Sequence, residues 1–174
     1  SIMGSIIKVN EYKDFNNNDI MTSDGSGNVT INAAAMKNTP AFYAYKTSTQ
    51  SIANTTGTQV TFDSEIFDTD GTFSSDRFTP AVAGKYYIYA QINMAAVDGK
   101  YFETRIHKNG SLYSYTQTHM GTVTYNAGSY IGQVIDSDDD DYFEIFTYQN
   151  TGGSINVAGD NKNTYFGAYR IIGA

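Results

Sequence analysis

The sequence contains no cysteine and no tryptophan, and Leu112 is its one leucine. Without cysteine the chain can form no disulfide, use no thiol nucleophile and build no cysteine-based zinc site. Strong helix formers such as Leu, Glu, Lys and Arg are scarce, which disfavours a helical fold. No apolar run reaches the roughly 18 residues of a membrane-spanning helix, so we expect no membrane insertion.

Positive charge is also scarce. The sequence has 11 Lys and Arg residues and 18 Asp and Glu residues, which gives a net charge of −7. The basic residues are scattered singly, whereas binding to phosphates needs them clustered, so we expect no nucleic-acid partner. The two histidines, His107 and His119, have no metal-ligand spacing, and no nucleophile elbow or phosphate-binding loop occurs. Glu103 and Glu144 are the one conceivable carboxylate pair for sugar hydrolysis, and nothing in the sequence brings them together. We therefore expect no enzyme.

Aromatic residues are abundant instead, with 15 Tyr and 10 Phe, and Asn, Gly, Asp and Ser separate the aromatic runs. Tyr, Phe and Thr favour strands, and the intervening residues favour turns. Short strands at regular spacing are typical of a sandwich or barrel. The pattern predicts an all-β domain with strands at 42–45, 59–62, 86–94, 101–108, 112–116, 130–135, 142–149, 155–157 and 165–172.

The composition changes at Thr39-Pro40, which divides an N-terminal arm (1–39) from a domain (40–174). In the arm, Ile20-Met21 and the apolar segment 29–31 flank the turn residues 24–28, which predicts a hairpin. Ala33 to Met36 has enough helix propensity for one turn. The arm holds too little apolar mass to fold alone, so it must pack on something or stay mobile.

Several strands carry aromatic residues on both faces. On 86–94, Tyr86, Ile88 and their alternates form one face, while Tyr87 and Tyr89 lie on the other. One core can cover only one face of a sheet, and tyrosine is enriched at protein interfaces. We therefore predict a subunit interface; the alternative is a few isolated tyrosines under loops. The predicted interface residues are Tyr87, Tyr89, Phe146, Tyr148, Tyr165 and Tyr169.

The stretch 62–86 resembles the signature of the complement C1q globular head, a branch of the tumour necrosis factor-like (TNF-like) jelly rolls. The residues that carry the resemblance are Phe62, Asp68, Phe73, Phe78, Gly84 and Tyr86, with the first-strand segment 40–45 and the last-strand segment 164–169. The resemblance implies a ten-stranded jelly-roll sandwich that forms tight homotrimers, with aromatic residues of the inner sheet facing the three-fold axis.

Five aspartates fall within six positions: Asp136, Asp138, Asp139, Asp140 and Asp141. An aspartate-rich turn can supply several of the oxygen ligands that calcium needs. Related trimeric heads hold calcium near the three-fold axis, so the resemblance adds to this hypothesis. The alternative is a solvated acidic hairpin loop with no cofactor.

These observations lead to two functional hypotheses. The first is a homotrimeric structural or adhesive virion protein of a tailed phage, extracellular once the virion is assembled. Its arm would dock to other virion proteins, and its jelly-roll head would bind a host surface receptor or glycan or stabilise the particle. The arm resembles segments that precede such heads in phage fibres and appendages, and exposed loops at 47–58, 116–126 and 159–163 are candidate contact regions. The alternative is an extracellular bacterial binding module for glycans or proteins.

Overall fold

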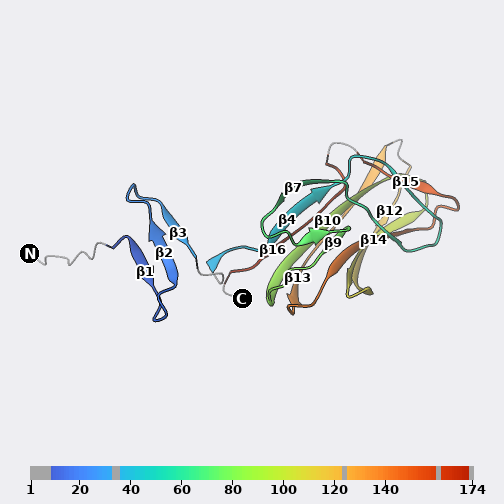
Figure 1. The fold of residues 1–174 in the computed structure, drawn as a ribbon. Coiled ribbons are helices and arrows are strands. Elements are labelled where there is room, and N and C mark those ends of the chain that lie inside the picture. The colour runs from blue at the N-terminus through green and yellow to red at the C-terminus, as the bar shows by residue number, and fades with distance from the viewer. Residues whose placement is uncertain (1–8, 33–35, 123–124, 160–161, 173–174) are drawn as a thin grey trace, which may run out of the picture.

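The computed structural model describes residues 9–32, 36–122, 125–159 and 162–172, and all the extended regular elements in these ranges are β-strands. Of the helical turn expected at Ala33 to Met36, only Met36 lies within the described residues. Figure 1 shows a small sheet, β1 to β3, lying apart from a larger sandwich that contains the remaining strands. The small sheet precedes Pro40 in the chain, and the strands of the sandwich follow it.

The first sheet of the sandwich is built around two twelve-residue strands. β13 pairs antiparallel with β10 along its whole length, the other edge of β10 pairs with β16, and β16 pairs with β4. β7 extends this sheet beyond β4, and β15 and β5 continue it from the end of β10. Its strands are β4 (Ala41–Tyr45), β5 (Gln50–Ile52), β7 (Ser64–Asp68), β10 (Gly84–Ala95), β13 (Asn126–Ser137), β15 (Ile155–Val157) and β16 (Tyr165–Arg170).

The second sheet lies across the core from the first and follows the order β12-β11-β14-β9-β8, with β6 paired to β14. A two-residue turn, Asn109-Gly110, joins β11 to β12. Both residues have positive φ, which a tight two-residue hairpin turn of this kind requires. The strands are β6 (Thr58–Gln59), β8 (Phe73–Ser74), β9 (Arg77–Phe78), β11 (Tyr101–Lys108), β12 (Ser111–His119) and β14 (Phe143–Gln149).

Phenylalanine rings fill the space between the two sheets. Phe42 stacks on Phe73 with ring centroids 4.6 Å apart and meets Phe166 edge-on at 4.8 Å. Burying each such side chain contributes roughly 1.5–3 kcal/mol. The hydroxyl of the buried Tyr86 donates to the carbonyl of Val82 at 2.8 Å, so its polar end is satisfied. The core therefore needs neither a disulfide nor a metal.

The predicted alternation is confirmed. Ile88, Phe143 and Phe166 are fully buried, as are their alternates on the same strands, and Tyr87, Phe146 and Tyr165 point outward. The strand prediction at 59–62 was wrong, because pairing there covers Thr58–Gln59 alone, and the last strand ends at Arg170. Sequence patterns missed β5, β8 and β9, which have two or three residues and are too short for alternation to show, and they missed the five-residue β7, whose residues do not alternate.

The arm forms a three-stranded antiparallel sheet of β1 (Glu11–Lys13), β2 (Asp19–Ser23) and β3 (Val29–Ile31). The predicted hairpin is the β2–β3 pair, and β1 adds a third strand on the other edge of β2. The sequence does not predict this third strand, because three residues are too few to show the alternation of apolar and polar side chains.

The two turns of the arm use the same Asp-x-x-x-Asn device. Asp14 Oδ1 accepts the N–H groups of Asn16 and Asn18 at 2.9 and 2.8 Å, and its Oδ2 accepts the Asn18 amide at 2.9 Å. Asp24 does the same for Ser26 and Asn28, with the side-chain amide of Asn28 at 2.6 Å. Each carboxylate accepts hydrogen bonds from backbone N–H groups of the turn, for which a short turn has no backbone carbonyl in reach.

These turns should open in acid. Hydrogen bonds from the Asn28 side chain and then from the Ser26 N–H lower the pKa of Asp24, and those from Asn18 lower the pKa of Asp14. Because the pKa of each carboxyl is lower in the folded than in the unfolded chain, the ionised carboxylate stabilises the fold. This stabilisation is complete above the unfolded-state pKa of about 3.9, and it is lost as pH falls through the lower pKa of the folded state. Amide resonances of Asn18 and Asn28 should therefore shift with midpoints below 3.9.

The Asp24→Asn variant is the matched control, because it removes the titrating group from the second turn and leaves the first turn intact. In this variant the Asn28 amide should lose its acid transition while Asn18 keeps its own. Midpoints at or above 3.9 in the unmodified chain would contradict the role given to the two carboxylates.

Candidate interaction surfaces

Seven tyrosines cover the outward face of the first sheet, and we call this surface the tyrosine face. Strand register places them side by side, since Tyr87 faces Tyr169 and Gln91 faces both Tyr165 and Tyr130. Four of the predicted interface residues, Tyr87, Tyr89, Tyr165 and Tyr169, thus share one surface. The full set is Tyr43, Tyr45, Tyr87, Tyr89, Tyr130, Tyr165 and Tyr169. The three that we missed also alternate outward in their strands, so the same rule applied to β4 and β13 would have found them.

Five of the seven rings of the tyrosine face pack on one another, namely those of Tyr43, Tyr87, Tyr89, Tyr165 and Tyr169. Tyr89 is at the centre, within 5.6–6.4 Å of the ring centroids of its neighbours Tyr43, Tyr87, Tyr165 and Tyr169. Tyr43 also stacks on Tyr165 at 5.4 Å. At one edge, the hydroxyls of Tyr87 and Tyr130 form a hydrogen bond of 2.8 Å. Such a cluster of mutually packed rings presents a rigid surface that loses little side-chain entropy on binding.

Two glycines let the rings lie against the sheet. A Cβ atom on Gly167 would stand 2.5 Å from Cζ and Oη of Tyr89, and one on Gly132 would stand 2.3 Å from the hydroxyl of Tyr87. Glycine inside a strand often marks such a close approach. The tyrosine face is therefore shaped by the backbone as well as by its side chains.

The centre of the tyrosine face carries no charge, and one cation lies at its edge, where the Lys162 ammonium stands 5.3 Å from the centroid of the Tyr45 ring. Among the described residues, the outward positions from Tyr87 to Asn93 on β10, and those beside them on β13, β16 and β4, carry no charged side chain. Charges occur at the margins, where Lys85 pairs with Asp136 at 2.8 Å. Burial, and then the neighbouring tyrosines, raise the pKa of Tyr89 to about 12, and burial also raises the pKa of Tyr130. The hydroxyls of Tyr89 and Tyr130 therefore stay neutral near pH 7.

The other two predicted interface residues, Phe146 and Tyr148, lie on the outward face of the second sheet, across the sandwich from the tyrosine face. His107 stacks on Phe146 with centroids 4.0 Å apart, and Arg105 lies over Tyr148 at 4.7 Å. The six predicted residues therefore form two separate surfaces. Alternation shows that a side chain points outward, but it does not show which sheet the strand joins.

Glu103 and Glu144 are each paired with an arginine. Glu103 binds Arg105 at 2.7 Å, and Glu144 binds Arg77 at 2.9 Å. Glu144 lies opposite His107 on the neighbouring strand. His107 follows Glu103 by four residues on β11, so the two glutamates are separated by about 13 Å along the strand direction. Glycosidases hold their two carboxyl groups within about 9.5 Å of each other, so this arrangement does not suit sugar hydrolysis.

The aspartate run does not converge on one point. Asp136 pairs with Lys85, whereas Asp141 binds Lys108 at 2.7 Å, the Asn109 amide at 2.6 Å and the Asp138 N–H at 2.7 Å. Both carboxylate oxygens of Asp141 thus have partners already. In the described part of the chain, no three His, Asp or Glu side chains gather as metal ligands would. These residues do not fit a calcium site, and Asp141 instead closes the β13–β14 turn.

At the tip of the β1–β2 turn, the ring of Phe15 is fully exposed. The Asp14 turn described above fixes the backbone on both sides of it. Single exposed apolar side chains are common on protein surfaces, but one on a turn with a fixed backbone can act as an anchor when a partner offers a pocket. Sequence analysis did not single it out, because one aromatic residue in a polar turn has no pattern.

Comparison with known proteins gives a result at the level of fold. No protein-family model and no curated protein matches the chain. Among solved structures, murine APRIL at pH 5.0 is 12% identical with a TM-score of 0.59, covering 75% of this chain and 98% of that one. The globular domain of zebrafish complement 1qA protein is 17% identical with a TM-score of 0.58, covering 76% and 96%.

The TNF protein Eiger from S. frugiperda is 10% identical with a TM-score of 0.55, covering 77% of this chain and 93% of its own. The chain is therefore an all-β jelly-roll sandwich of the TNF and C1q type, as the resemblance at 62–86 predicted. In the described residues, no helix has the length and apolar character needed to cross a membrane.

Adding one methyl group at Gly167 should disturb the tyrosine face. In Gly167→Ala, the new Cβ would overlap the Tyr89 ring, so the ring must move and the fold should lose about 1–3 kcal/mol. Thermal unfolding measures this loss. Gly153→Ala is the control, since a Cβ there meets nothing within 4 Å. Equal melting temperatures for the two variants would show that the rings are not held as described.

Proposed function

We propose that the chain is a homotrimeric structural and adhesive virion protein of a tailed phage, extracellular once assembled. The tyrosine face carries this proposal. The sheet below it already covers the core with its other face, so these rings do not serve the fold of one chain. Aromatic, uncharged and rigid surfaces are typical of the centres of interfaces. Three copies in the arrangement that the jelly-roll resemblance implies would cover this face.

The arm would attach the trimer to other virion proteins. Its small sheet ends in the exposed Phe15, and the capped turn holds that ring away from the rest of the arm. An anchor of this kind binds well because little entropy is lost when it enters an apolar pocket. The arm segment 25–32 resembles segments that precede such heads in phage fibres and appendages, which supports this role.

The head would then expose the second sheet for binding a host surface or for bracing the particle. Its outward face combines aromatic rings with charged groups, including Tyr115, Tyr148 and Arg105. The alternative, an extracellular bacterial module that binds glycans or proteins, would use the same surface but would not need Phe15. The arm therefore distinguishes the two functions.

Placing charge on the tyrosine face should dissociate the trimer. Tyr169→Lys would bring three ammonium groups into a surface that offers no carboxylate, and burying unpaired charge costs several kcal/mol. Light scattering at micromolar concentration should give the monomer mass for this variant. Tyr115→Lys, on the second sheet and more exposed, should remain trimeric. A trimeric Tyr169→Lys variant would exclude the tyrosine face as the interface.

Truncating the anchor should release the protein from the virion. Phe15→Ser removes the ring and keeps the turn, so the number of copies per purified particle should fall, with a loss of affinity of at least tenfold. Asn16→Ser, at the next position of the same turn, is the control and should bind normally. Normal occupancy for Phe15→Ser would show that the arm attaches by another route, and a protein absent from virions would favour the bacterial alternative.

A further inference from the structure

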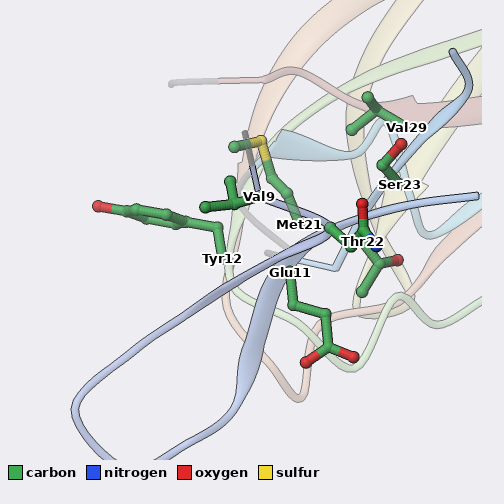
Figure 2. Close-up of a pocket in the computed structure, with 8 residues that line it drawn as sticks. Val9, Glu11, Tyr12, Met21, Thr22, Ser23 and Val29 are labelled. Carbon is green, nitrogen blue, oxygen red and sulfur yellow. The ribbon is translucent and has the colours of Figure 1, made fainter. Parts of the chain in front are cut away.

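The arm's sheet has one apolar face that nothing in its own fold covers. Cross-strand register puts Tyr12, Met21 and Ile31 in one row, with Val29 beside them. Figure 2 shows Val9, Tyr12 and Met21 gathered on one side and the Glu11 carboxylate directed away. A hollow of about 90 Å³ lies among these residues. Val9, Tyr12 and Val29 are each exposed by more than half, at 58%, 56% and 60%.

The opposite face is mainly polar, with Glu11, Thr22 and Thr30 in the neighbouring row. A sheet that is apolar on one side only is half of a two-layer structure. Val9, Tyr12 and Val29 keep this exposure with the rest of the chain in place, so the sandwich does not provide the second layer. Three strands of three to five residues are marginal in water without one.

The position of the arm on the chain indicates what the second layer is. Residues 32–40 join the small sheet to β4, and nine residues span about 30 Å at most. β4 is the strand that carries Tyr43 and Tyr45 of the tyrosine face. In a trimer assembled on that face, three arms therefore begin next to the common axis. Tethering over such a distance gives an effective concentration in the millimolar range.

We propose that the three arms of the homotrimer pack their apolar faces on one another, forming a three-sided β-prism coaxial with the heads. β2 is the middle strand, so Met21 lies nearest the axis and Tyr12 and Val29 flank it. Each arm thereby gains the missing apolar layer from the other two. This inference rests on the proposed function, because it requires the trimer. Phe15, at the end of the hairpin, stays free to bind the particle.

Disulfide cross-linking of the full chain tests the prism, and the absence of native cysteine makes the result unambiguous. Met21→Cys would place three thiols near the axis, so mild oxidation should link two of the three chains into a dimer band on a non-reducing gel. Thr22→Cys is the matched control, since its side chain lies on the other face of the same strand and should not cross-link. The yield from Met21→Cys should not change on tenfold dilution, because the reaction occurs within one trimer.

Tyr12→Cys and Glu11→Cys repeat the comparison on the adjacent strand, in case Met21→Cys disturbs the sheet. Light scattering of the same samples separates the possible failures. A trimer in which neither Met21→Cys nor Tyr12→Cys cross-links would overturn the prism and leave the proposed function intact, with the apolar face then free for a virion protein. Cross-linking of the control positions would overturn it equally. A monomer would overturn the trimer itself.

Discussion

The structure depends on one sheet that is apolar on both of its faces. β10 buries Tyr86, Ile88 and Met94 in the sandwich and presents Tyr87 and Tyr89 on the other side. The second sheet of the same chain covers the inner face, and in the proposed trimer a second chain would cover the tyrosine face. Folding and assembly would then be coupled through one layer of backbone, and Gly132 and Gly167 are the positions where a side chain would collide with the tyrosine rings.

The arm follows the same logic on a smaller scale. Its turns are closed by Asp14 and Asp24, which define hairpin geometry without any core. Local hydrogen bonds can set a turn, but they do not cover an apolar face, and Val9, Tyr12 and Val29 stay exposed in the single chain. Because the arm enters β4 beside Tyr43, assembly of the heads in the proposed trimer would bring the three arms together. One association event would then organise both parts of the molecule.

Sequence patterns predicted the elements with strong alternation, above all 86–94 and 142–149, and the signature at 62–86 predicted the jelly roll. They failed for β7, where the residues Ser-Glu-Ile-Phe-Asp do not alternate and a register shift occurs opposite Tyr43 and Ala44. They also grouped Phe146 with Tyr87, since outward direction is a local property and membership of a sheet is a property of the whole topology. Glycine roles stayed hidden for the same reason: Gly167 matters because of Tyr89, a residue far away in sequence.

The central claim is that the tyrosine face joins three chains, and the mass of the unmodified protein in solution tests it most directly. Sedimentation equilibrium over a range of micromolar concentrations should give three times the chain mass of 19.1 kDa, unchanged on dilution. A single species of 19.1 kDa at every concentration would contradict the trimer.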